Sequence, residues 1–205
     1  MAGRRWERYN DAVNTTMTAI LDDAQRIARQ PGRSLADLAA MAAAIELSDE
    51  ELAELLRVDP ERPYGRRVLL DGEYLEAMIA RWTPGMPCAP HDHGQSSGVV
   101  RLLRGAADHV RWQVRDDGLH RAAEERVEAG HVMSCGPQMV HSMGDGGADE
   151  PLVTLHFYMG PIPHMMVYDL DEQRTYKVSG GCGAWIPHDQ PELIDAMRDG
   201  IHRSL

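Results

Sequence analysis

Cysteine and long apolar runs are scarce in this sequence of 205 residues. The three cysteines, Cys88, Cys135 and Cys182, are too few and too scattered for the disulfide framework of a small secreted domain. No stretch approaches the roughly 20 apolar residues of a membrane-spanning helix, and residues 1–10 lack the apolar core of a signal peptide. We therefore expect a cytoplasmic protein that has no membrane partner.

Positive charge is in short supply as well. Lysine and arginine number 21 against 32 aspartates and glutamates, which gives a formal net charge of −11. This balance argues against a nucleic-acid partner, because phosphate backbones are bound by clustered basic side chains. Individual arginines remain available to bind a small anion.

Helix formers dominate the first part of the chain. Alanine, leucine, methionine, glutamate and arginine are frequent over residues 11–57, and Pro31 and Gly32 form a break between two helices. Ser34 and Ser48 stand where helix N-caps are expected, each with an acidic residue three positions later. We expect residues 1–59 to form a helical region that packs on the rest of the molecule.

Short segments of β-branched or alternating character replace the helical pattern after residue 60. Glycine- and aspartate-containing turns separate them, and we expect strands over 66–70, 74–82, 98–103, 107–114, 131–134, 152–158 and 175–178. Many short strands joined by turns predict a mostly β protein, with an antiparallel barrel or sandwich over residues 60–190. Residues 191–205 are expected to form a C-terminal helical tail.

The most informative motif is a pair of histidines one residue apart, His91 and His93. If this segment is extended, both side chains point to one face and Asp92 points to the other. Two imidazoles on one face, joined by a third histidine such as His141, can hold a metal ion and leave coordination positions open. Open positions are what a substrate and dioxygen require.

Two groups of residues around these histidines resemble the two cupin signatures: Gly85, His91, His93 and Gly105 in the first, and Gly130, Pro137 and His141 in the second. Many cupins have a glutamate ligand where this sequence has Gly98, so the set here is three histidines without a carboxylate. That set is similar to the thiol dioxygenases, of which cysteine dioxygenase is the best known. The resemblance covers roughly residues 64–185. It implies a cupin fold, a jelly-roll-like antiparallel β-barrel, with Fe(II) held by His91, His93 and His141.

Two further motifs are similar to the same family. Cysteine dioxygenases have a Tyr-x-Arg at the place of Tyr64 and Arg66, and the arginine there holds the substrate carboxylate through charge-assisted hydrogen bonds. They also have a Ser-x-His-x-Tyr sequence similar to Thr154, His156 and Tyr158, whose side chains share a face if this segment is a strand. The resemblance implies that Thr154 and His156 orient the hydroxyl of Tyr158 beside the iron.

Gly98 departs from the mammalian enzymes, in which a cysteine at this place is covalently linked to the active-site tyrosine. Bacterial relatives often have glycine here, so the sequence resembles the bacterial type that lacks the crosslink. Arg67 alternates with Arg66 along the expected strand and is expected to be solvated. The remaining histidines are expected in surface or structural positions, among them His109, His120, His131, His164 and His188.

The resemblance implies that L-cysteine and O2 are converted to cysteine sulfinic acid by a monomer or small homo-oligomer. Three alternatives stay open. The thiol could be 3-mercaptopropionate, although relatives that act on it typically carry glutamine in place of Arg66. The protein could instead be a cupin dioxygenase of a carbon substrate, or a non-catalytic cupin that binds a small molecule as a sensor. Zinc could also occupy the site in a purified sample, because imidazole ligands suit several metals.

Overall fold

The computed structural model describes residues 15–205, and the expectation for residues 1–10 lies outside this part of the chain. Three helices come first, α1 (Thr15–Arg29), α2 (Leu35–Ala43) and α3 (Asp49–Leu55). Ser34 caps α2 by accepting a hydrogen bond from the Asp37 N–H, and Ser48 caps α3 in a capping box with Glu51. Both predicted N-caps are confirmed. Among the described residues, no helix is long and apolar enough to cross a membrane.

The strands form three antiparallel sheets. The largest has the order β1-β2-β8-β3-β6 and contains β1 (Tyr64–Asp71), β2 (Glu76–Trp82), β3 (Ser97–Arg104), β6 (Val132–Cys135) and β8 (Val153–Met159). A second sheet has the order β5-β4-β7, with β4 (Ala106–Arg115), β5 (Gly118–Glu128) and β7 (Val140–Asp145). The third has the order β11-β10-β9, with β9 (His164–Asp169), β10 (Arg174–Ser179) and β11 (Ile194–Asp199).

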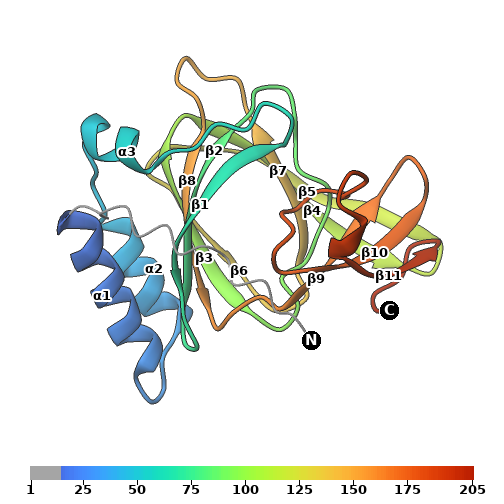
Figure 1. Ribbon diagram of the computed structural model, residues 1–205, viewed down its shortest axis with the longest axis horizontal. Coiled ribbons are helices and arrows are strands. Elements are labelled where there is room, and N and C mark those ends of the chain that lie inside the picture. Colours follow the sequence, from blue (N-terminus) through green and yellow to red (C-terminus); the bar gives the residue numbers. More distant parts are fainter. Residues whose placement is uncertain (1–14) are drawn as a thin grey trace.

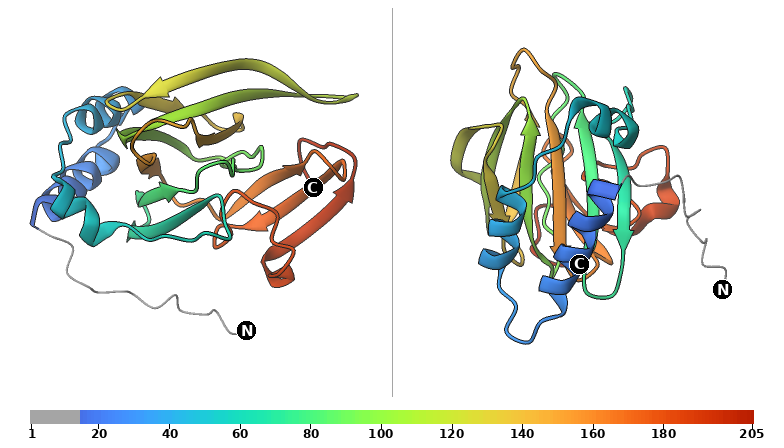
Figure 2. Two further views of the ribbon diagram at one scale, coloured as in Figure 1. Left: turned by 90° about the horizontal axis from the view of Figure 1, so that it is seen from above. Right: turned by 90° about the vertical axis from the view of Figure 1, so that its left-hand side faces the viewer.

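The first two sheets lie on opposite sides of a barrel interior (Figures 1 and 2). The third sheet lies beside the barrel, on the side away from α1 and α2. The segment between β2 and β3 joins these parts, because His91 forms single antiparallel bridges with His141 of β7 and with Val167 of β9. One candidate metal ligand is therefore fixed where the second and third sheets meet.

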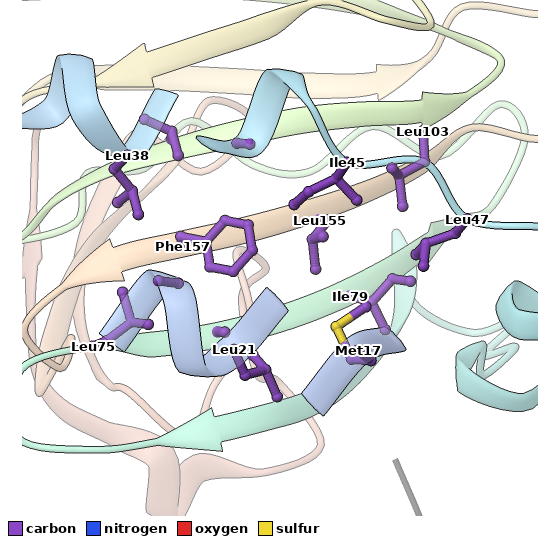
Figure 3. Close-up of a cluster of buried hydrophobic side chains, with 14 of the residues drawn as sticks. Met17, Leu21, Leu38, Ile45, Leu47, Leu75, Ile79, Leu103, Leu155 and Phe157 are labelled. Atoms are coloured by element: carbon purple, nitrogen blue, oxygen red, sulfur yellow. The ribbon is translucent and has the colours of Figure 1, made fainter. Parts of the chain in front are cut away.

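The helices α1 and α2 cover the outer face of the five-stranded sheet (Figure 1). A hydrophobic core fills the space between them, with Phe157 and Leu155 of β8 packed among residues such as Met17, Leu21, Leu38 and Ile79 (Figure 3). Residues 153–158 of β8 are all buried, so both faces of this strand are covered. Because side chains alternate along a strand, the other face of β8 points into the barrel.

The C-terminal segment contradicts the predicted helical tail. Helical structure is limited to the single 3-10 turn Pro191–Leu193, and β11 then pairs antiparallel with β10. Ala196, Met197 and Arg198 are helix formers by intrinsic propensity, but the edge of β10 presents backbone groups that a neighbouring strand satisfies. The prediction is wrong because strand pairing outweighs local preference here.

Arg67 also differs from the expectation that it is solvated. Its side chain lies on the strand face opposite Arg66, as predicted, but α3 covers that face and leaves Arg67 only 8% exposed. The Arg67 guanidinium donates a hydrogen bond to the Glu54 carbonyl oxygen of α3 at 2.9 Å. Arg67 is therefore a buried link between β1 and the helical region.

Candidate metal centre

Three buried histidines meet inside the barrel. His91 and His93 come from the segment between β2 and β3, and His141 comes from β7. Each offers one ring nitrogen, and these nitrogens all lie within 4.8 Å of one another. The three residues are 7%, 2% and 4% exposed in chain order. Among the described residues they form the group of potential ligands whose geometry fits a single metal ion.

Main-chain hydrogen bonds fix these ligands before any ion binds. The N–H of His91 donates to the carbonyl oxygen of His141 at 2.9 Å, and the reciprocal bond is 3.0 Å long. Asp92 points away from the cluster, and its carboxylate accepts hydrogen bonds from the N–H groups of Gly94 and Met166. The alternation expected for His91, Asp92 and His93 is therefore what positions the two imidazoles.

The three imidazoles of the cluster are neutral, so each has a ring nitrogen with a free lone pair. Burial lowers the pKa of His91 to about 4, and burial together with the neighbouring histidines lowers the pKa values of His93 and His141 well below the usual range. The Nδ1 of His91 lies 2.9 Å from the Ala89 carbonyl oxygen, which leaves its Nε2 for a metal. Within residues 15–205, the buried Nε2 of His141 and Nδ1 of His93 have no hydrogen-bond partner. Neutral imidazoles with unpartnered nitrogens fit a divalent metal ion.

A chain of polar side chains on the inner face of β8 leads to this cluster. The Oγ1 of Thr154 lies 2.8 Å from Nε2 of His156, whose Nδ1 lies 3.1 Å from the Tyr158 hydroxyl. The same hydroxyl lies 3.4 Å from Nε2 of His93. The indole N–H of Trp82 donates to the Thr154 oxygen at 2.9 Å. The three β8 residues therefore connect the sheet to one of the potential ligands.

The proton positions in this chain follow from donor and acceptor counting. Because the Trp82 N–H already donates to Thr154, the buried Thr154 hydroxyl satisfies its own proton by donating to Nε2 of His156. Nδ1 of His156 then carries the proton and donates to the Tyr158 oxygen. The hydroxyl proton of Tyr158 is left to point toward the cluster. Burial raises the pKa of Tyr158 well above the usual range, so this phenol stays protonated.

Arg66 and Tyr64 line the same pocket as His91, His93 and Tyr158. The Arg66 guanidinium donates one hydrogen bond to the Gly181 carbonyl oxygen at 2.6 Å, and its fork has further donors. The Tyr64 hydroxyl accepts a hydrogen bond from the Ala184 N–H at 2.9 Å. The pocket is small, with about 20 Å³ of space for the centres of water-sized molecules.

Glu76 was not among the residues expected at the site. It begins β2, lines the pocket, and accepts a hydrogen bond from the Ile162 N–H at 3.3 Å. Burial raises the pKa of this carboxyl, while the Ile162 N–H and the charge of Arg66 act in the opposite direction. The pocket therefore carries an acidic and a basic side chain. The alternation of β2 could have indicated Glu76, because it shares a face with Met78, another lining residue.

Gly98 lies directly under the ring of Tyr158. A Cβ atom at this position would lie 2.4 Å from Cδ1 of Tyr158, so a larger residue requires the ring to move. Cys135 pairs with Gly98 across β3 and β6 and is buried. The Cys88 thiol lies on the other side of the cluster, 3.8 Å from Nδ1 of His91, and accepts a hydrogen bond from the Met143 N–H.

The other histidines separate into two kinds. His109 is buried and lies against His141, and it is a contact that the sequence did not reveal. The remaining ones are not part of the cluster: His164 bonds to Asp195 at 2.7 Å, and His120 bonds to Asp117 at 2.8 Å. The contact between His109 and His141 arises from the register of β4 against β7. It could not be predicted from the sequence, because the two residues are far apart along the chain.

Comparison with known proteins shows to which family the chain belongs. A sequence model of the family described as cysteine dioxygenase type I matches residues 10–171. The chain belongs to the cysteine dioxygenase type I family. The match contains the three histidines, Arg66 and Tyr158. Family membership and the antiparallel sheets confirm the prediction of a mostly β cupin fold with N-terminal helices.

Solved structures resemble this family member at low sequence identity. A Klebsiella pneumoniae protein with a double-stranded β-helix domain is 17% identical with a TM-score of 0.49, and the match covers 58% of this chain and 94% of that chain. A cupin 2 domain-containing protein from Halorhodospira halophila is 21% identical with a TM-score of 0.43, covering 56% of this chain and 76% of that chain. Membership in the cysteine dioxygenase family indicates a dioxygenase, and the three-histidine cluster fits a non-haem metal.

Proposed function

We propose that this protein is a non-haem Fe(II) thiol dioxygenase that converts L-cysteine and O2 to cysteine sulfinic acid. One observation carries the proposal. Three buried, neutral histidines form one cluster, and two of them, His91 and His93, line a pocket together with a protonated tyrosine and an arginine. Both oxygen atoms are added to sulfur in this reaction, so no external reductant is required.

The histidines would hold the metal without neutralising it. His91, His93 and His141 are neutral imidazoles, so the full positive charge of the ion would remain to favour a thiolate. Bound Fe(II) would supply the coordination positions at which the thiolate and O2 come together. Burial of the ligands excludes water from the space where the substrate is oxidised.

Arg66 and Tyr64 would hold the substrate carboxylate. A guanidinium fork forms two charge-assisted hydrogen bonds to a carboxylate, and the bond to Gly181 keeps Arg66 at the pocket wall. Tyr64 accepts from the Ala184 N–H, and its own hydroxyl proton is therefore available to a carboxylate oxygen. Burial raises the pKa of Tyr64 to about 12, which keeps that proton in place at neutral pH.

Tyr158 would act on the reacting atoms. The chain from Thr154 through His156 ends with the Tyr158 hydroxyl proton directed toward His93 and the pocket. A donor held in this way can orient the substrate and stabilise negative charge that develops on oxygen.

One feature favours cysteine over 3-mercaptopropionate. Arg66 provides a partner for the carboxylate that both thiols carry, while the Glu76 carboxylate lining the same pocket complements the amino group that cysteine alone carries.

Anaerobic reconstitution with Fe(II), followed by O2 uptake with a panel of thiols, tests the proposal. We expect about one iron per chain and O2 uptake with cysteine that exceeds the uptake with 3-mercaptopropionate or cysteamine. His93→Ala should lose iron and activity together. Full iron content in that variant would contradict the ligand assignment. If the protein binds iron but none of the thiols supports O2 uptake, a dioxygenase of a carbon substrate or a sensor would be favoured.

A further inference from the structure

A second pair of side chains stands behind His141, on the side away from His91 and His93. His109 of β4 is 4% exposed, and its Nε2 lies 3.0 Å from Nδ1 of His141. The opposite nitrogen of His109, Nδ1, lies 3.1 Å from a carboxylate oxygen of Glu125 on β5. The Glu125 side chain is 52% exposed. A continuous line of hydrogen-bonding groups therefore runs from the histidine cluster to the molecular surface.

The register of the second sheet creates this line. His109 pairs with Glu125 directly across β4 and β5, and β4 pairs with β7 so that Arg111 lies opposite His141. His109 is two residues from Arg111 and is therefore the diagonal neighbour of His141. Directly opposite and diagonal side chains of neighbouring strands lie on one face of the sheet within reach of each other.

Only one arrangement of protons satisfies every group in the line while leaving His141 able to bind a metal. The Nε2 of His141 is buried and unpartnered, so as a ligand it carries no proton and Nδ1 carries the proton instead. Nδ1 of His141 must then donate to Nε2 of His109. His109 in turn holds its proton on Nδ1 and donates it to Glu125. Each hydrogen bond has one donor and one acceptor, and the line ends on a carboxylate.

We propose that His109 and Glu125 are positioning residues that hold His141 in its metal-binding tautomer and strengthen it as a ligand. The inference rests on the proposed metal site and does not depend on which thiol is oxidised. Among the described residues, the other two ligands have no side chain behind them that leads to a carboxylate: Nδ1 of His91 meets the neutral Ala89 carbonyl, and Nε2 of His93 faces the Tyr158 hydroxyl. His141 is thus the ligand whose orientation and basicity a carboxylate sets through a second side chain.

Metal titration tests the inference without turnover. Apo protein is titrated anaerobically with Co(II) in competition with a chelator, and the ligand-field absorption of the bound ion is recorded. His109→Leu removes the acceptor for His141 and should weaken Co(II) binding by about 10- to 100-fold. His109→Gln places an amide oxygen near the position of Nε2, and it should recover most of the affinity and the wild-type spectrum.

Glu125 provides a second variant. Its side chain is half exposed, so its replacement should not disturb folding. Glu125→Ala should weaken Co(II) binding by several fold and shift the ligand-field bands, while the melting temperature of the apo protein stays unchanged. Glu124→Ala is the matched control, because Glu124 comes directly before Glu125 in β5 and its carboxylate bonds to Arg121 instead. Its affinity and spectrum should match wild type.

The possible failures are distinguishable. Wild-type affinity and spectrum in both His109→Leu and Glu125→Ala would overturn the positioning role and leave the proposed function intact. Equal weakening in His109→Leu and His109→Gln, with unchanged spectra in Glu125→Ala, would also overturn it, because packing alone would then explain the effect. Failure of the wild-type protein to bind a metal would instead overturn the proposed function.

Discussion

Arg66 is the residue on which recognition of a carboxylate depends. Arg66→Ala should raise the KM for cysteine strongly, because a charge-assisted partner in a desolvated site is worth roughly 2–4 kcal/mol. Steady-state O2 uptake with cysteine and with cysteamine, which has no carboxylate, provides the measurement. Arg62→Ala is a suitable control, since Arg62 lies over the same Trp185 ring as Arg66 but bonds to Asp189. An equal effect on both thiols would exclude Arg66 as the carboxylate partner.

Tyr158 is the residue that links the β8 chain to the chemistry. Tyr158→Phe keeps the ring against Gly98 and removes only the hydroxyl, so it should lower kcat by about 100- to 1,000-fold through loss of the positioned donor. Iron content should stay near the wild-type value, because Tyr158 is not one of the three ligands.

The tyrosine should also be unmodified. Gly98 has no thiol to form a link, so peptide mass analysis of the wild-type protein should show no thioether at Tyr158. Undiminished turnover in Tyr158→Phe would remove the hydroxyl from the mechanism, and a thioether to Cys88 or Cys135 would overturn the expectation of a free phenol.

At the scale of single residues, most of what could be predicted about the site came from the alternation of side chains along an extended strand. It placed His91 and His93 on one side with Asp92 on the other, and the hydrogen bonds of Asp92 agree with it. It could not reveal His109, whose contact with His141 depends on the pairing of strands far apart in the sequence. Cross-strand register is a property of the folded sheet, and no local pattern encodes it.

At the scale of elements, β8 shows how one strand serves two purposes. Its outer face contributes Leu155 and Phe157 to the core beneath α1 and α2 (Figure 3). Its inner face carries the chain of hydrogen-bonding side chains that ends at Tyr158. Leu155→Ala should therefore lower the free energy of unfolding by about 2–5 kcal/mol through the lost burial and the cavity left behind. Denaturant unfolding measures the loss.

The metal site should be unaffected by that change. Co(II) affinity of folded Leu155→Ala protein should equal that of wild type, since the altered side chain points to the opposite face from Thr154 and His156. A large loss of affinity at unchanged fold would show that the two faces are coupled.

The elements that could be predicted are those with a clear local pattern. The α2 and α3 caps and the strands β1, β2, β3, β4, β6, β8 and β10 fall close to the expected positions. The strands β7 and β9 were not predicted from the sequence, although most of their residues are buried. In contrast, β5 has mostly exposed or half-buried residues and no apolar face, so its strand character comes from pairing with β4. The same reason explains β11. Its residues favour a helix by intrinsic propensity, and it is a strand because it pairs with the edge of β10.

At the scale of the whole molecule, closing the barrel buries several neutral histidines, and that makes stability depend on pH. Burial lowers the pKa of His156 to about 3 from an ordinary value of 6.5. As the pH falls below 6.5, the unfolded chain gains a proton at this residue that the folded protein does not. The free energy of unfolding then decreases by about 1.4 kcal/mol per pH unit for this histidine, until the pH reaches the folded pKa.

His156→Gln isolates this contribution. Between pH 6.5 and pH 5, metal-free wild-type protein should lose about 2 kcal/mol more stability than the variant, measured by denaturant unfolding with chelator present. Identical pH dependence in the two proteins would mean that His156 is already accessible to protons in the folded state.

The fate of the oxygen atoms tests the central claim most directly. The Fe(II)-reconstituted protein is given cysteine under isotope-labelled O2, and the product is analysed by mass spectrometry. A thiol dioxygenase yields cysteine sulfinic acid that carries two labelled oxygen atoms, with one O2 consumed for each product molecule. The absence of sulfinic acid, or a product with a single labelled oxygen, would contradict the account.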